Sequence, residues 1–280
     1  MRTVIDQCSE VECHRLRKSS SLRCTGGRVP FGGVGTLVLV RHGQSQWNLE
    51  NRFTGWWDVP LSDQGQTEAR SAGQLIAAEG LMVDIAHTSV LTRAISTLNL
   101  ALEEMGQQWV PVTKHWRLNE RHYGGLTGLD KAETRERYGD EQFMKWRRSY
   151  DVPPPPMEAG HKFDIRSDPR YRHVPADVVP ATECLADVVV RMLPYWYDAI
   201  APDVLAGKTV LVAAHGNSLR ALIKHLEQIS DSEITGLEIP TGVPMVYELD
   251  DDLGIVSKRE LGDPEAIAAA AEAVRRQGDR

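Results

Sequence analysis

Two short apolar runs rich in β-branched residues stand out along the chain, at residues 36–40 and 209–214. Continuous apolar runs of this length are typical of strands buried on both faces of a parallel sheet. Each run leads into a histidine that is followed by glycine and small polar residues, at His42 and at His215. Because ligands bind at the carboxyl ends of strands in open α/β sheets, we expect the two imidazoles to face one anionic substrate.

Strand and helix signals alternate along the rest of the chain. Ser62 is a candidate N-cap for a first helix, which Gly80 would end. Further strands are predicted at residues 83–88, 110–112 (a short edge strand), 244–249 and 255–260. Further helices are predicted at residues 93–104, 131–149, 183–199, 219–224 and 264–275. This alternation predicts an α/β fold with a mostly parallel central sheet and helices on both faces.

The pattern changes between about residues 120 and 182. Four consecutive prolines, 153–156, favour an extended polyproline segment and exclude a helix or a central strand there. The sequence stays irregular up to residue 182. Since long irregular segments in compact domains are often functional, we expect a lid insertion at 150–182 within a catalytic domain spanning 36–263. Residues 264–280 are expected to form a helical tail.

The first 35 residues differ from the rest in composition. They carry six basic and three acidic residues, three of the four cysteines and no sustained apolar period. They also lack the apolar segment of a secretory signal. The spacing of Cys8, Cys13 and His14 fits no common zinc pattern. A transit peptide remains open, although the acidic residues weaken it, and we expect a disordered extension or an upstream mis-start of the reading frame.

The overall composition narrows the function classes. The chain has 280 residues, is 41% hydrophobic and has a formal net charge of −7. The negative charge argues against a general nucleic-acid or membrane-surface binder, and no apolar stretch approaches the roughly 20 residues of a membrane span. Cys184 stands alone in the body of the chain, which implies no disulfide framework and fits a cytoplasmic protein.

The residues around His42 suit phosphoryl chemistry better than a structural role. Arg41 supplies a positive charge for phosphate, Gly43 lets the backbone approach a ligand closely, and Ser45 and Asn48 add donors. A neutral imidazole can act as a nucleophile and carry a covalent intermediate. The phosphorus–nitrogen bond formed in this way is reactive enough to give the group back.

His215 and Glu120 complete the candidate chemistry. His215 precedes Gly216 and Asn217 at a predicted helix start, where free N–H groups bind anions, and a protonated His215 could neutralise charge on a transferring group. Glu120 precedes Arg121, and basic neighbours should lower the pKa of its carboxyl in the empty site. A bound phosphate should raise that pKa, which would make Glu120 a proton donor only when substrate is present.

The segments 41–43 and 215–217, which contain the two histidines, resemble the histidine phosphatase superfamily. Longer blocks narrow the resemblance to the 2,3-bisphosphoglycerate-dependent phosphoglycerate mutases, and it runs from about residue 36 to 263. The blocks lie at residues 41–43, 52–56, 88–94, 118–124, 129–134, 146–148, 215–217 and 239–244. The resemblance implies a glycolytic and gluconeogenic isomerase that interconverts 2-phosphoglycerate and 3-phosphoglycerate. It also implies 2,3-bisphosphoglycerate as primer, no metal, and a homo-oligomer (dimer or tetramer).

The same resemblance implies a role for each matching residue. His42 would be the phosphohistidine, Glu120 the proton donor, and His215 the stabiliser of the transition state. Arg41, Arg93 and Asn48 would hold the transferring phosphoryl group. The remaining substrate-binding candidates are Gly43, Gln44, Ser45, Gln46, Trp47, Thr54, Gly55, Arg121, His122, Tyr123, Lys131, Arg147, Arg148, Gly216 and Asn217.

Three other interpretations can be weighed against this one. A phosphatase of the same superfamily would hydrolyse the same phosphohistidine, but it has less need of cations for a second anionic group. A non-catalytic binding protein would be favoured if His42, Glu120 or His215 were replaced, and all three are present. A dinucleotide site at the glycines of 32–35 fails, because those glycines precede the strand that such a fingerprint must follow.

Overall fold

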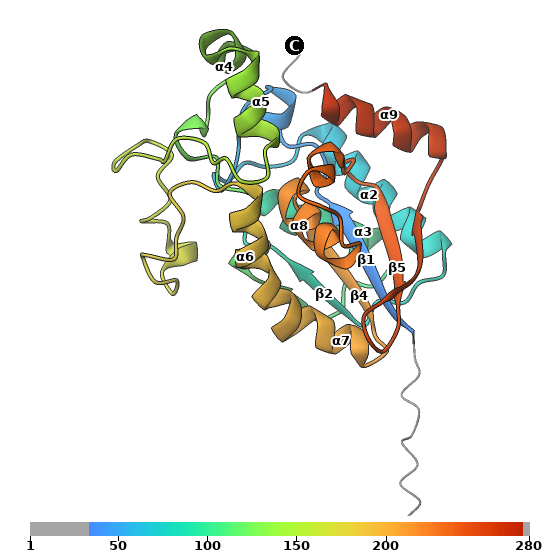
Figure 1. The fold of residues 1–280 in the computed structure, drawn as a ribbon. Coiled ribbons are helices and arrows are strands. Elements are labelled where there is room, and N and C mark those ends of the chain that lie inside the picture. The colour runs from blue at the N-terminus through green and yellow to red at the C-terminus, as the bar shows by residue number, and fades with distance from the viewer. Residues whose placement is uncertain (1–33, 277–280) are drawn as a thin grey trace, which may run out of the picture. The chain divides into compact units, whose positions relative to one another are not determined.

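The computed structural model describes residues 34–276, which contain one six-stranded sheet of order β3-β2-β4-β1-β5-β6 (Figure 1). The four strands from β3 to β1 run parallel, whereas β5 and β6 are antiparallel to their neighbours. The predicted mostly parallel sheet is therefore confirmed. The strands are β1 Gly35–Arg41, β2 Ile85–Thr88, β3 Val112–Lys114, β4 Thr209–Ala214, β5 Pro244–Leu249 and β6 Ile255–Glu260.

Helices cover both faces of this sheet. Helices α6, α7 and α8 pack on one face and α2 and α3 on the other (Figure 1). The α-helices are α1 Gln46–Leu49, α2 Asp63–Ala78, α3 Thr92–Glu104, α4 Lys131–Tyr138, α5 Asp140–Arg148, α6 Leu185–Tyr195, α7 Ala201–Leu205, α8 Gly216–Leu226 and α9 Pro264–Arg275. Among residues 34–276, no helix combines the length and the apolar character needed to cross a membrane.

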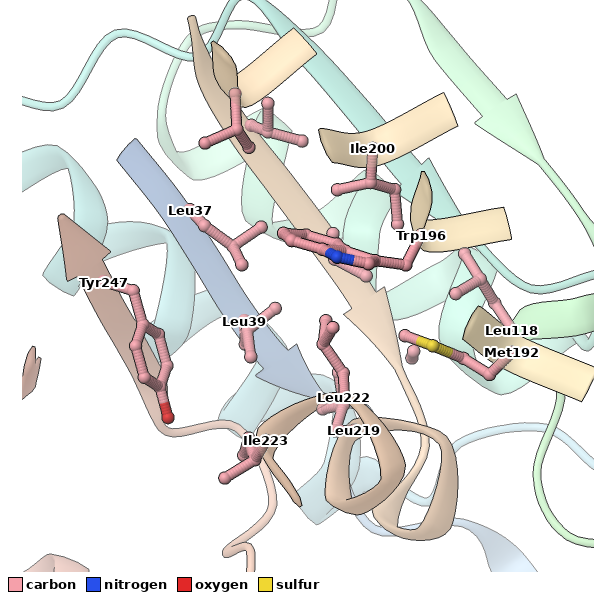
Figure 2. Packing of buried hydrophobic residues seen from close by; sticks show 14 of the residues in the cluster. Leu37, Leu39, Leu118, Met192, Trp196, Ile200, Leu219, Leu222, Ile223 and Tyr247 are labelled. Atoms are coloured by element: carbon pink, nitrogen blue, oxygen red, sulfur yellow. The ribbon is translucent and has the colours of Figure 1, made fainter. Parts of the chain in front are cut away.

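The two apolar runs form the centre of the core because their side chains are buried on both faces. Leu37 and Leu39 of β1 meet Trp196 and Leu222 on one face (Figure 2). Val38 and Val40 of the same strand pack on the α2–α3 side. Full burial of a Leu or Val side chain stabilises a fold by about 1.5–3 kcal/mol, so these strands hold the histidine loops on a rigid base.

Most predicted elements are confirmed, and two strands are corrected at their ends. Ser62 caps α2 through the Gly65 N–H, and the helix ends just before Gly80, whose φ is +69°. Strand β2 begins at Ile85 rather than at residue 83. Strand β3 lies at 112–114 rather than at 110–112, because Pro111 has no N–H for the ladder. The predicted edge position of β3 is correct.

Two predicted helices are also corrected. The stretch 131–149 is divided into α4 and α5 by Gly139, whose φ is +80°. The stretch 183–199 begins as α6 at Leu185, then passes through a π-helical turn, Trp196–Ile200, into α7. Pro194 and Pro202 lack the N–H that a regular helix uses, and the π turn lies between them.

Residues 150–182 contain one 3₁₀ turn, Pro169–Tyr171, and are otherwise irregular, as predicted. Ile165 and Tyr171 of this segment pack against Trp56, which anchors it beside the site. Its role as a lid stays a prediction. The expectations for the N-terminal segment, including Cys8, Cys13 and His14, concern residues that lie outside the described range, which begins at residue 34.

Candidate active site

The predicted pair of imidazoles is present at the carboxyl ends of the neighbouring strands β1 and β4. The rings of His42 and His215 lie edge to face with their centroids 4.9 Å apart. The Nδ1 atom of His42 is 2.7 Å from the Gly43 carbonyl oxygen, which can only accept a hydrogen bond. Nδ1 therefore carries the proton, and the lone pair of Nε2 is left toward the site. The Arg93 Nε lies 3.4 Å from that Nε2.

Burial keeps both histidines neutral in the free protein. It lowers the pKa of His42 well below its usual value, and Arg93 and Arg41 lower it further. Burial also lowers the pKa of His215, with Arg93 as the next contributor. A neutral His42 is the nucleophilic form. Protonation of His215 with phosphate bound stays a prediction, since a bound anion would act against these shifts.

His215 is oriented by a serine at the end of a third strand. The Ser89 Oγ, just beyond β2, lies 2.7 Å from the His215 Nε2. The same Oγ accepts a hydrogen bond from the Leu91 N–H, so it is held in place. Ser89 was not a candidate from the sequence, although it follows a predicted strand that neighbours the strand leading to His215. Because ligands bind at the carboxyl ends of parallel strands, the predicted strand at 83–88 would have indicated Ser89 as a candidate.

Glu120 lies opposite the histidines with its carboxylate held by donors. Its Oε1 accepts hydrogen bonds from the Arg121 N–H at 2.8 Å and from the Asn217 side chain at 2.8 Å. Burial raises the pKa of Glu120, but these hydrogen bonds, together with Arg41 and Arg93, lower it below its usual value. The expected lowering of the Glu120 pKa is confirmed. The hydrogen bonds lower this pKa more than the basic side chains do.

The backbone around Glu120 is clamped from helix α6 by Arg191. The Arg191 guanidinium donates to the carbonyls of Arg117 at 2.6 Å and of Asn119 and Glu120 at 3.2 Å. It also pairs with Glu183 at 2.6 Å, and both side chains are buried. Arg191 therefore fixes the loop that carries the candidate proton donor.

A close backbone crossing positions the loop after β1. A Cβ added to Gly43 would lie 2.1 Å from the Gly65 carbonyl oxygen, and a Cβ on Gly65 would lie 2.0 Å from the Gln44 carbonyl oxygen. Only glycine at both positions allows the start of α2 to pack this closely against the His42 loop.

We call His42, Arg93, Glu120 and His215 the floor of the site, and Lys131, Arg147 and Arg148 its rim. The rim residues come from α4 and α5. Burial, with Arg147 and Arg41 adding to it, lowers the pKa of Lys131 to about 7. The Arg147 guanidinium donates to the Val274 carbonyl of α9 at 3.0 Å, and Arg148 forms an ion pair with Glu238.

Two pockets that share several lining residues border the rim and most of the floor, whereas the fully buried His215 lines neither. The predicted residues that line them are Arg41, His42, Asn48, Thr54, Gly55, Arg93, Glu120, Tyr123, Lys131, Arg147, Arg148, Gly216 and Asn217. Lining residues outside the predicted set are Arg52, Phe53, Arg220, Glu238 and Val274. Glu238 and Val274 lie far from the histidine motifs in sequence, whereas Arg220 follows His215 by five residues in α8.

The loop residues after Gly43 do not line these pockets. Gln44 accepts from the Ser62 hydroxyl, and its N–H donates to Glu68. Ser45 caps the short helix α1, and Gln46 begins it. Trp47 lies under the Arg52 guanidinium, 4.0 Å from it.

Two further candidates lie behind the pockets. Arg121 is buried with its guanidinium 4.6 Å from the centre of the Tyr123 ring, and it donates to the Arg147 carbonyl at 3.1 Å. The Nδ1 of His122 accepts from the Gly124 N–H, and burial lowers the pKa of His122 to about 4. Both residues therefore connect the Glu120 loop to its surroundings.

The floor also brings together three side chains of a kind that bind metals. Donor atoms of His42, Glu120 and His215 lie within 4.8 Å of one another. Two imidazoles and a carboxylate are a ligand set that zinc accepts. The positive charges of Arg41 and Arg93 beside these side chains disfavour a bound metal ion. The arrangement therefore suits an anion better than a cation.

The fold and the paired histidines agree with a family comparison. The model of the histidine phosphatase superfamily (branch 1) matches residues 37–177, and the chain belongs to this superfamily. A 2,3-bisphosphoglycerate-dependent phosphoglycerate mutase from Thermobifida fusca (strain YX) is 60% identical over 249 residues, which cover 88% of this chain and 100% of the relative. One from Sphingopyxis alaskensis is 64% identical over 227 residues, which cover 81% and 98%. The chain belongs to this family of mutases.

A solved structure supports the fold alone. The mycobacterial glucosyl-3-phosphoglycerate phosphatase in complex with VO3 has a TM-score of 0.62 and 23% sequence identity to the chain. The match covers 81% of this chain and 97% of that one.

Proposed function

We propose that this protein interconverts 2-phosphoglycerate and 3-phosphoglycerate through a phosphohistidine on His42 and a 2,3-bisphosphoglycerate intermediate. The observation that carries the proposal is the floor, where the Nε2 lone pair of His42 lies beside Arg93, close to His215 and Glu120. The names of the relatives support the same activity. When bound, 2,3-bisphosphoglycerate supplies the phosphoryl group that charges His42.

Each floor residue has one task in this reaction. The Nε2 of His42 attacks phosphorus, the ester P–O bond breaks, and the released oxygen takes a proton from the Glu120 carboxyl. In the reverse transfer Glu120 accepts the proton of the attacking hydroxyl, and the P–N bond breaks. Arg41, Arg93 and His215 stabilise the charge on the phosphoryl oxygens.

The rim favours a mutase over a phosphatase. Lys131, Arg147 and Arg148 line the pocket that also includes Glu120, so a substrate with one phosphate on the floor has cations for a second anionic group. Bidentate contacts from arginine suit phosphate and carboxylate. The same cations fit 2,3-bisphosphoglycerate as primer. We propose that they replace the metal that other phosphoryl-transfer enzymes use.

An assay from 3-phosphoglycerate, with and without 2,3-bisphosphoglycerate, tests the proposal. We expect primer-dependent activity that survives dialysis against EDTA and falls by about four orders of magnitude or more in His42→Ala. Activity that requires manganese and no primer, or that persists in His42→Ala, would exclude the phosphohistidine route. Release of inorganic phosphate at the mutase rate would favour the phosphatase alternative.

We further propose a cytoplasmic homo-oligomer that binds neither nucleic acid nor membranes. The edge strand β3 supports self-association, since its three residues are exposed and Trp109 close to it is 68% exposed. The free thiol of Cys184 fits a reducing compartment. Light scattering of the purified protein, compared with a Trp109→Ser variant, measures whether this edge forms a dimer or tetramer contact.

A further inference from the structure

Glu238 places a negative charge in a pocket whose other charged wall residues are mostly cations. Its carboxylate lines the pocket of Glu120 and the rim, and its side chain is only 11% exposed. One oxygen forms an ion pair with Arg148, and the other lies 3.7 Å from the Arg220 guanidinium. The carboxylate therefore pairs with Arg148, one of the cations that a second anionic group of the substrate would contact.

The backbone on both sides of Glu238 is fixed. Arg220 donates to the Leu237 carbonyl at 2.8 Å and 3.0 Å, and Arg41 donates to the Ile239 carbonyl at 2.7 Å. Both guanidiniums also line the pocket. Because the carbonyls on both sides of it are held by the site itself, the backbone of Glu238 stays at the pocket when a ligand arrives, and only its side chain has to move away from Arg148.

The two carboxylate oxygens of Glu238 are held unequally: one forms the close ion pair with Arg148, and the other faces Arg220 only at 3.7 Å. Its Oε2 is buried and accepts no hydrogen bond from the described residues. A phosphate that enters the pocket would meet the Glu238 carboxylate as a like charge, in a region screened from water.

We propose that the Glu238 carboxylate competes with the second anionic group of the substrate for Arg148. This competition lowers the affinity of the site for bisphosphorylated ligands. The proposal rests on the proposed function, since it assigns Arg148 to that second group. The anion displaces the Glu238 carboxylate from Arg148 on binding, and Glu238 returns when the ligand leaves. Glu238 thereby determines specificity by keeping the primer from saturating the site.

Calorimetry of 2,3-bisphosphoglycerate binding to the full chain tests this, in a His42→Ala background so that no transfer occurs. We expect Glu238→Gln to bind the ligand about tenfold more tightly, because the amide keeps the shape and removes the charge. Glu272→Gln is the matched control, since it removes the same charge from α9 outside this pocket. The control should bind within about twofold of the parent.

The outcomes separate the two proposals. Equal or weaker binding by Glu238→Gln overturns the competitor role, and weaker binding would show that Glu238 only orients Arg148. An equal gain in Glu272→Gln would also overturn it, because the effect would then be one of general charge. Ligand binding by none of the variants, with no mutase activity in the unmodified protein, would overturn the proposed function together with this inference.

The ion pair with Arg148 can be tested separately. In an Arg148→Gln background the gain from Glu238→Gln should shrink to about twofold, because the competition for Arg148 is gone. A gain that is unchanged in this background contradicts the proposed displacement. Circular dichroism and thermal melting of each variant show whether the fold is kept.

Discussion

The floor and the rim of the site are built in different ways. The floor side chains come from the loops after β1 and β4, from the first turn of α3 and from the loop held by Arg191, and they are buried. The rim comes from α4 and α5, in which the buried residues are Lys131, Thr134 and Phe143. Its arginines contact other parts of the protein, namely a carbonyl of α9 and the carboxylate of Glu238.

This difference separates the chemistry from the choice of ligand. Phosphoryl transfer needs groups fixed to within a fraction of an ångström, and a strand-supported floor provides this. A bound intermediate that must reorient between two phosphoryl transfers needs contacts that can be broken and formed again. We therefore expect floor substitutions to change kcat and rim substitutions to change KM.

The largest effect is expected at the floor, from Glu120→Gln. The amide keeps an oxygen for the Arg121 and Asn217 donors but cannot give up a proton, so kcat should fall by about 10²–10⁴ with KM nearly unchanged. Steady-state mutase kinetics measure this. A kcat within threefold of the parent would mean that another group supplies the proton.

The next effect is expected one layer behind the floor, from Arg191→Met. The substitution leaves the Glu183 carboxylate buried without its partner, so the free energy of unfolding should fall by about 3–5 kcal/mol. The Glu120 loop loses its clamp, and kcat should fall by about tenfold or more. Urea denaturation and mutase assays measure the two effects.

A double variant separates stability from positioning. Glu183→Gln combined with Arg191→Met removes the unpaired charge, so stability should largely return while kcat stays low. Recovery of both quantities together would show that Arg191 has only a structural role.

At the rim, Arg147→Met should raise KM for 3-phosphoglycerate by about tenfold with kcat little changed. Its contact with α9 lies at the surface, so the melting temperature should stay within a few degrees. Arg137→Met is the control, because Arg137 is an exposed cation of α4 outside the pocket. A fall in kcat as large as that of Glu120→Gln would remove the distinction between floor and rim.

The smallest expected effect is a pH dependence of anion binding at the rim. With its pKa at about 7, Lys131 is charged below that pH and loses its charge as the pH rises through it. The inhibition constant of sulfate, which keeps its charge, should therefore rise roughly tenfold between pH 6 and pH 8.5. In Lys131→Arg the constant should be flat over this range, and a rise of the same size would assign the titration to another group.

The two histidines of the floor follow from the strand pattern itself, whereas Lys131, Arg147 and Arg148 of the rim are candidates only through the resemblance. Apolar runs ending in His42 and His215 predicted two strand ends, and adjacent parallel strands must bring such ends together. The rim depends on pairs such as Arg148 and Glu238, which no local period or motif connects. The resemblance makes the loop residues Gln44 and Trp47 substrate-binding candidates. In the structure Gln44 accepts from the Ser62 hydroxyl and Trp47 packs against Arg52, because the Gly43–Gly65 crossing places the loop against α2.

The strand order also has a consequence for how the protein is made. β1 is one of the first described segments to be synthesised, yet its partners β4 and β5 are among the last, in the registers Thr36–Thr209 and Thr36–Glu248. Contacts between such distant segments form only after the chain between them has been closed. A nascent or truncated chain that ends before residue 209 thus carries His42 without His215 and without a finished sheet. Unfinished copies of this protein can neither accept nor lose a phosphoryl group at a formed site, so translation has to be nearly complete before the chemistry exists.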